Sequence, residues 1–186
     1  MVRKTKRDWL IEALTVLAEV GAQSLTIDLL TERLSVTKGS FYHHFGNYDG
    51  FKESLLDFFE AEGTLEIIDY TEEGHTPQDK LQRLLEVTAA FSPDVEVAIR
   101  AWALQDDMVR AYQTRIDQRR IAYVKSLFVA LTGDDTLAQQ RAEILYIVYI
   151  GSQQVFPPIN GEALMRHYTD LRHFFDDKNQ VEEDHS

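Results

Sequence analysis

Helical periodicity runs through almost the whole of this 186-residue chain and limits its fold more than any other feature. Near the start, Leu10, Leu14 and Leu17 recur at the spacing that places side chains on one face of a helix. The strand-like run at residues 144–150 follows a helix-favouring segment and has no second strand candidate with which to pair. The sequence therefore predicts an all-α protein.

Helix caps and breakers divide this pattern into separate elements. Threonine and asparagine side chains accept hydrogen bonds from the first N–H groups of a helix, and glycine or proline ends one. Such residues predict a first helix capped by Thr5 and ended by Gly21, a second from Thr26 to Leu34, a third from Lys38 to Phe45 capped by Thr37, and a fourth from Asn47 to about Gly63. They also predict a long helix from about Asp106 to Leu131, one from Thr136 towards Val155 that Pro157 cannot continue, and a last one from about Asn160 to Phe175.

Several classes of protein are excluded by what the sequence lacks. The absence of cysteine excludes disulfides, thiolate metal sites and cysteine nucleophiles, and a reducing cytoplasm suits such a chain. The strongest apolar run, residues 144–151, is far shorter than the ~18 residues that a membrane-spanning helix needs. The sequence contains no glycine-rich phosphate loop, nucleophile elbow or acidic metal cluster. We therefore expect a cytoplasmic protein without membrane contact, enzymatic activity, metal or cofactor.

Charge is distributed unevenly along the chain. The net charge is -12, yet basic and acidic residues balance within residues 1–50. The whole excess of acid therefore lies beyond residue 50. Such asymmetry indicates two parts with different partners.

The first three predicted helices have the spacing of a helix-turn-helix, with a turn at residues 35–37. Phe41 and Phe45 are four residues apart and would anchor the third helix inward, while Gly39 and Ser40 are small enough for close approach to a DNA groove. The side chains and backbone positions predicted to contact DNA are Thr26, Thr37, Lys38, Gly39, Ser40, Tyr42, His43, His44, Tyr48, Lys4 and Lys6.

Residues 25–45, which read LTIDLLTERLSVTKGSFYHHF, resemble the DNA-binding segment of the tetracycline-repressor (TetR) family of bacterial regulators. The resemblance covers about the first third of the chain. Two positions depart from the family pattern. Ser35 stands where the turn often has glycine, so its backbone angles are expected to differ slightly, and Tyr48 replaces a lysine that often grips phosphate at the start of the fourth helix.

The resemblance implies a DNA-binding domain over residues 1–46 and a helical ligand-binding and dimerisation domain over residues 47–175. The acidic tail, residues 176–186, is predicted to be disordered. An apolar helix and a matching stripe on the last helix suggest a dimer interface built from Ile147, Ile150, Gly151, Leu164, Tyr168 and Leu171. Aromatic and polar residues near apolar stripes suggest a ligand pocket lined by Arg100, Trp102, Gln105, Tyr112, Tyr123, Phe128, Tyr146 and Tyr149, although aromatic side chains at such positions are more often plain core.

The resemblance also implies a function: a homodimeric transcriptional repressor that a small molecule releases from a roughly palindromic DNA operator. Two alternatives stay open. A helical adaptor could keep this fold without DNA binding, which a sequence-specific footprint would exclude. A small-molecule enzyme is the less favoured alternative, because the motifs of the common enzyme classes are missing from the sequence.

Overall fold

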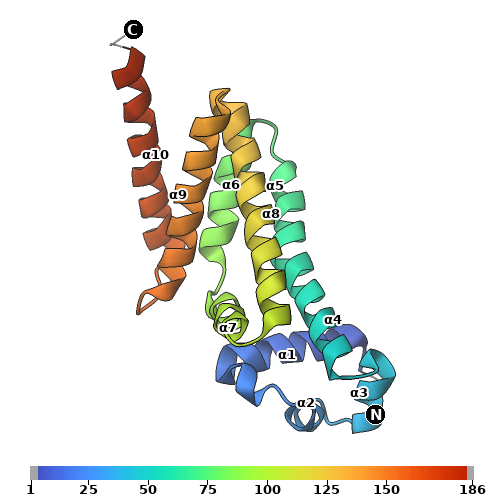
Figure 1. Cartoon of the computed structure of the whole chain (residues 1–186). Helices are drawn as coiled ribbons and strands as arrows, with labels where there is room; N and C mark the ends of the chain where they lie inside the picture. Colours follow the sequence, from blue (N-terminus) through green and yellow to red (C-terminus); the bar gives the residue numbers. More distant parts are fainter. Residues whose placement is uncertain (1–3, 184–186) are drawn as a thin grey trace. The chain divides into compact units, whose positions relative to one another are not determined.

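The computed structural model describes residues 4–183, with side-chain burial defined up to residue 175. Regular structure in this range is helical throughout, which confirms the predicted all-α class (Figure 1). None of its helices combines the length and apolar character needed to cross a bilayer. The α-helices are α1 (Lys6–Val20), α2 (Ile27–Leu34), α3 (Lys38–Phe45), α4 (Tyr48–Glu60), α5 (Glu66–Glu72), α6 (Pro77–Ala90), α7 (Asp94–Ala103), α8 (Asp107–Thr132), α9 (Asp135–Gln154) and α10 (Gly161–Glu183), with a 3-10 turn η1 (Ala22–Ser24) and a π-helical turn η2 (Ala61–Leu65).

Most of the predicted caps form. The Asp8 N–H donates to Thr5 Oγ1 over 3.2 Å and Asp8 Oδ2 accepts from the Thr5 N–H over 2.7 Å, which makes a capping box at the start of α1. The side chains of Thr26 and Asn47 cap α2 and α4. Thr37 is the N-cap residue of α3, but its side chain makes no capping hydrogen bond. The start of α3 is therefore held by packing rather than by its own cap.

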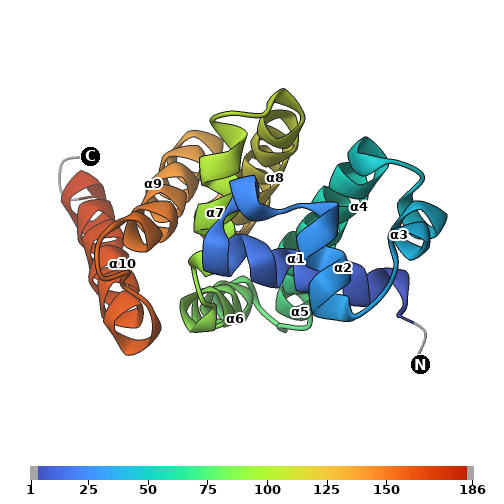
Figure 2. The same cartoon turned by 90° about the horizontal axis from the view of Figure 1, so that it is seen from below.

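Contacts divide the chain into two compact units, each with its own core. The first, here called the N-terminal unit, comprises Met1–Leu65 and Pro93–Ile116. Its centre is aromatic: the Phe41 ring lies 5.6 Å from Trp9 and 5.2 Å from Phe51, centroid to centroid, and all three are fully buried. The predicted inward anchors of α3 are therefore confirmed. Figure 2 shows the helices α1 to α4 of this unit.

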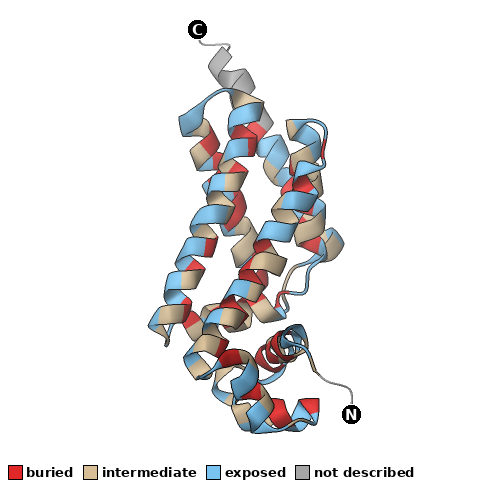
Figure 3. Cartoon of the chain, turned by 90° about the vertical axis from the view of Figure 1, so that its right-hand side faces the viewer, coloured by how far each residue is buried: buried red, intermediate tan, exposed pale blue. Residues whose placement is uncertain are grey.

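The second unit, called the C-terminal unit, comprises Glu66–Ser92 and Asp117–Ser186. In it α10 packs on α6 and α9, and the buried positions form stripes along the helices (Figures 1 and 3). Helix α10 continues to Glu183, beyond the predicted end at Phe175. Residues 184–186 of the predicted tail lie outside the described residues.

The boundary between these units differs from the predicted functional division at residue 46. Helix α4 packs on α1 and α3, and its buried Leu55 belongs to the same core as Trp9. Helix α7 also packs on α1. The helix-turn-helix is thus stabilised by α4 and α7 within one unit, and the division of function between residues 1–46 and 47–175 stays a prediction.

The turn before α3 contains a strained residue that glycine would relieve. Ser35 adopts φ 54° and ψ 48°, the left-handed conformation, as the glycine usual at this place would. We expect Ser35→Gly to raise the free energy of unfolding by about 1 kcal/mol, because the steric cost of its β-carbon exceeds the entropy that glycine adds to the unfolded chain. Urea unfolding followed by the fluorescence of Trp9 and Trp102, both in the N-terminal unit, measures this change.

The matched control for this substitution is Glu32→Gly, because Glu32 lies in the right-handed backbone of α2 one turn earlier. Glycine there should instead lower the free energy of unfolding by about 1 kcal/mol. If both glycine substitutions destabilised the protein to the same extent, the backbone at Ser35 would not be strained.

Candidate nucleic-acid interface

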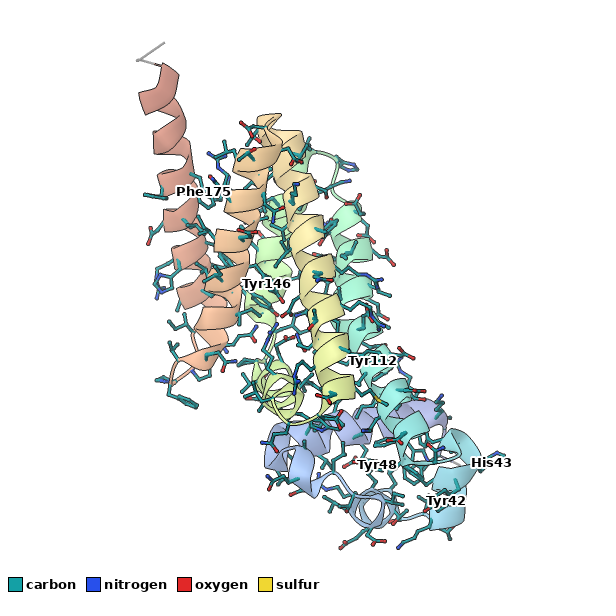
Figure 4. All side chains as sticks on the ribbon, in the orientation of Figure 1. Tyr42, His43, Tyr48, Tyr112, Tyr146 and Phe175 are labelled. Carbon is teal, nitrogen blue, oxygen red and sulfur yellow. The ribbon has the colours of Figure 1, made fainter. Side chains whose placement is uncertain are left out.

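Helix α3 is anchored on one side and exposed on the other. Phe41 and Phe45 are buried in the N-terminal core, while Lys38, Tyr42 and His43 are exposed. Figure 4 shows His43 pointing away from the helices of this unit. The preceding turn fixes the approach to α3 through a hydrogen bond of 3.0 Å from the Val36 N–H to the Thr31 carbonyl. The exposed face and N-terminus of α3 therefore form a rigid, accessible edge.

Gly39 lies on this edge, and the fold does not require a glycine at this position. A β-carbon there would meet only the Thr37 Oγ1 atom, at an ordinary contact distance of 3.7 Å. Glycine inside a helix costs about 1 kcal/mol relative to alanine. A glycine that the fold does not need is consistent with close approach of another molecule to the backbone of α3.

The other predicted contacts near this edge differ in exposure. Thr26 and Thr37 are exposed, and Ser40 is half-buried. The Thr26 hydroxyl oxygen accepts from the Leu29 N–H over 3.2 Å, which leaves its proton for another acceptor. These residues lie at the N-termini of α2 and α3, where helix dipoles attract anions.

His44 is bonded within the chain, and its predicted contact with DNA stays a prediction. Its Nε2 atom lies 3.2 Å from the Lys4 carbonyl oxygen, to which it donates, and its ring is half-buried. This bond joins the chain before α1 to α3. Lys6 also approaches α3, with its Nζ atom 5.5 Å from the centre of the Phe45 ring. His44 thus holds the backbone at Lys4 beside the exposed edge.

The hydroxyl of Tyr48, which was predicted to contact DNA, makes a hydrogen bond within the chain. Its hydroxyl donates to the Leu25 carbonyl over 2.7 Å, and burial raises the pKa of Tyr48, so the hydroxyl stays protonated (Figure 4). A phenol has a single proton to donate. Tyr48 therefore cannot also donate from its side chain to a phosphate without breaking this bond. The substitution of lysine by tyrosine adds an internal contact, which sequence reasoning missed because the acceptor is a backbone carbonyl 23 residues away.

Three basic side chains of the N-terminal unit, Arg7, Arg33 and Lys38, form ion pairs with acids of the same chain. Arg7 contacts Glu62 over 2.8 Å, and Arg33 contacts Glu19 over 2.6 Å. Lys38, the first residue of α3, forms an ion pair with Asp28 on α2. The hydrogen bond to Asp28 raises the pKa of Lys38, so this lysine stays charged. Positive charge is thus present at the interface but partly compensated.

The residues predicted to line a ligand pocket are divided between the two units. In the N-terminal unit Trp102 and Gln105 line a cavity of about 220 Å³ together with Val20, Gly21, Ala22, Gln23, Ala98 and Ala101. In the same unit Arg100 pairs with Glu96 over 2.9 Å, and the Tyr112 ring lies under Arg115.

The remaining pocket candidates belong to the C-terminal unit, where they make internal contacts. Tyr123 donates to Glu72 and Tyr146 to Asp117, each over 2.7 Å. Tyr149 lies 6.1 Å from Tyr146, and Phe128 is buried against Phe175. In this chain Phe128 therefore packs as a core residue, and its place in a ligand pocket stays a prediction.

The predicted dimer residues also separate into two groups. Leu164 and Tyr168 are only 2% and 1% exposed and pack in the core of their own chain, so in the single chain they offer little surface to a second subunit. Leu171 is half-buried against the same core. The reason is that α10 turns this stripe towards α6 and α9.

The α9 residues of the prediction are, in contrast, accessible. Ile147 is 68% exposed, Gly151 is exposed and Ile150 is half-buried. Two residues that the prediction did not include are exposed as well: Ile144, one turn before Ile147, and Val155, the residue that follows the last residue of α9. These four residues, Ile144, Ile147, Gly151 and Val155, are here called the α9 stripe.

Comparisons with known proteins agree with this architecture. Residues 10–56 match the family model described as bacterial regulatory proteins, tetR family. No curated protein matches the chain. A protein described as a TetR-family transcriptional regulator from Rhodococcus sp. has a similar solved structure, with a TM-score of 0.69, 19% sequence identity and coverage of 92% of this chain and 97% of that chain.

Two further solved structures are similar in fold. One, described as a TetR/AcrR family regulator, has a TM-score of 0.68 and 19% identity and covers 89% of this chain and 98% of its own. A TetR-family regulator from Marinobacter aquaeolei VT8 has a TM-score of 0.57 and 18% identity, with coverage of 80% and 78%. These likenesses show a shared fold over most of the chain, and the family model identifies the helix-turn-helix segment. Residues 10–56 thus carry the segment that the tetR family model describes, and the chain shares its fold with solved TetR-family regulators.

Proposed function

We propose that this protein is a homodimeric regulator that reads a roughly palindromic DNA operator with α3. The observation that carries the proposal is the exposed N-terminal half of α3, with a glycine that the fold does not need and with Phe41 and Phe45 fixing the helix beneath it. In a helix-turn-helix the N-terminal residues of the second helix contact base edges in the major groove. Gly39, Ser40 and His43 are the positions we assign to this contact, with Thr26, Thr37, Lys38 and Tyr42 on the phosphates.

Dimerisation follows from the size of one reading helix and from the surface of α9. A single short helix contacts too few bases to define a site in a genome, and twofold symmetry doubles the contacts. The α9 stripe supplies an apolar surface that is accessible in the single chain. We propose that two copies bury this stripe against each other.

A small molecule is proposed to weaken operator binding. The position of the cavity lined by Trp102 and Gln105 supports its use as an effector site. The cavity lies between the end of α1 and α7, and these two helices pack together. Its lining combines an indole, small apolar residues and two glutamine amides without a charged side chain, so it suits a small neutral molecule. Native mass spectrometry of protein purified from its host would detect such a molecule, and an operator-binding assay with and without it would test release.

The test of DNA reading is a pair of substitutions with different expected outcomes. Lys38→Ala should weaken binding about equally for all duplexes, because phosphate contacts position a protein without specifying sequence. His43→Ala should change the preferred base at one position in each half-site, at a cost of about 1–3 kcal/mol for the preferred operator. Selection of bound duplexes from a randomised pool measures both.

Two results of this selection would change the proposal. A uniform loss for His43→Ala would move that residue to the phosphate contacts. Failure of the unaltered protein to enrich any sequence would favour the alternative, a helical adaptor of the same fold without DNA binding.

A further inference from the structure

Asp28 places a negative charge where a DNA-binding surface needs a positive one. It lies in the first turn of α2, and its Oδ1 atom forms an ion pair with Nζ of Lys38, the first residue of α3. The side chains are 75% and 59% exposed, respectively, so both face solvent at the interface proposed above. Lys38 is the one lysine or arginine within α3, and it is thus already paired with a carboxylate.

The same carboxylate lies at a helix N-terminus that would otherwise attract a phosphate. Thr26 is the N-cap of α2, and Asp28 is the acidic residue of its first turn. An anionic side chain in this position interacts favourably with the helix dipole. Asp28 therefore supplies, from within the chain, the negative charge that both the α2 N-terminus and Lys38 would otherwise take from DNA.

We propose that Asp28 is an intramolecular competitor of the DNA phosphate and limits the affinity of this protein for DNA. The inference rests on the proposed DNA-binding function. When α3 enters the groove, Lys38 exchanges the Asp28 carboxylate for a phosphate oxygen. An ion pair this exposed is weak enough to be displaced, so Asp28 lowers affinity without preventing binding.

The surrounding charges increase the effect of the Asp28–Lys38 pair on DNA affinity beyond that of a usual single surface contact. Arg7 and Arg33 are held by Glu62 and by Glu12 and Glu19, so they do not provide a surplus of positive charge in place of Lys38. Residues 1–50 are neutral overall. Because basic and acidic residues cancel in this segment, removal of the Asp28 carboxylate beside α3 would give residues 1–50 a net charge of about +1.

The test uses a mixed-sequence DNA duplex of about 30 base pairs, because phosphate contacts do not depend on sequence. Binding of the full chain is measured by fluorescence anisotropy between about 50 and 200 mM NaCl. Asp28→Asn should bind about 3- to 10-fold more tightly at the lowest salt and show a steeper dependence of affinity on salt, by up to about one phosphate contact. Glu32→Gln is the matched control, since it removes the same charge one turn further along α2 and should change affinity by less than about twofold.

The same Asp28→Asn substitution in a Lys38→Gln protein separates competition for Lys38 from simple repulsion between Asp28 and the DNA phosphates. In Lys38→Gln protein Asp28 can still occupy the α2 N-terminus but no longer the lysine, so Asp28→Asn should lose the larger part of its gain. An equal gain in both backgrounds, or an equal gain for Glu32→Gln, would overturn the proposal. These results differ from failure of the proposed function, in which the unaltered protein and every variant would leave the duplex unbound at all salt concentrations.

Discussion

Ile147→Glu is expected to convert the proposed dimer into monomers and to weaken operator binding by more than about 100-fold. Ile147 is 68% exposed and lies near the middle of the α9 stripe. Twofold symmetry would bring two copies of the new carboxylate into one apolar contact, where each would lose its water without gaining a partner. Sedimentation velocity at micromolar concentration measures the state of association, and anisotropy with an operator duplex measures binding.

The matched control is Ala130→Glu, which adds the same side chain to an exposed position of α8 in the same unit. It should leave both association and operator binding unchanged. Circular dichroism should show equal helix content for the two variants, because each substitution lies on the surface of a helix. A dimeric Ile147→Glu protein with normal operator binding would exclude the α9 stripe as the interface.

The local structure of the N-terminal unit could be predicted from sequence because its signals act over a few residues. Thr5 with Asp8, Thr26 and Asn47 each cap the expected helix, and these bonds join residues three positions apart. Glycine in the first turn of a helix usually weakens it, yet a β-carbon at Gly50 would lie 2.5 Å from the Phe45 carbonyl oxygen. The tight turn between α3 and α4 requires this glycine, a requirement that depends on the path of the backbone and is invisible in the sequence.

The functional surfaces were less predictable, because the type of a residue does not reveal whether its side chain points into the core or towards solvent. Both Ile147 and Leu164 have the apolar character of an interface, but α10 packs Leu164 inward while α9 leaves Ile147 accessible. The sequence predicts that Lys38 contacts DNA, whereas its pairing with Asp28 depends on the packing of α2 against α3. Contacts between elements distant in sequence decide these roles.

Replacing Asp106 by alanine is expected to lower the free energy of unfolding of the N-terminal unit by about 2–4 kcal/mol. One oxygen of this carboxylate accepts from the Met108 and Val109 N–H groups over 3.0 and 3.2 Å at the start of α8. The other accepts from Nζ of Lys52 on α4 over 2.9 Å. The side chain of Lys52 is only 13% exposed, so alanine removes a helix cap and also leaves a mostly buried ammonium without this partner.

Asp106→Asn separates these two effects. Asparagine can still cap α8 but carries no charge, so it should cost about half as much as alanine. The fluorescence of Trp9 and Trp102 follows unfolding of the unit that contains Asp106. Equal losses for the alanine and asparagine variants would assign the whole effect to the charge, and a loss for alanine alone would assign it to the cap.

The pH dependence of the asparagine variant gives an independent check of the Lys52 contact. Burial raises the pKa of Asp106, but the hydrogen bonds from Lys52 and from the Val109 and Met108 N–H groups outweigh it, and the pKa is lowered below its ordinary value of 3.8. The charged form is therefore the one that stabilises the fold. Its contribution is fully present above the pKa of the unfolded chain and is lost as the pH falls through the lower pKa of the folded protein.

The pKa of Lys52 is raised by the hydrogen bond to Asp106, so its contribution is lost only as the pH rises above about 10. The difference in unfolding free energy between the unaltered protein and Asp106→Asn should thus be constant from about pH 6 to 9 and should narrow below about pH 4. Urea unfolding at a series of pH values measures this difference. A difference that stayed constant down to about pH 3 would mean that the carboxylate charge does not stabilise the contact between α4 and the start of α8.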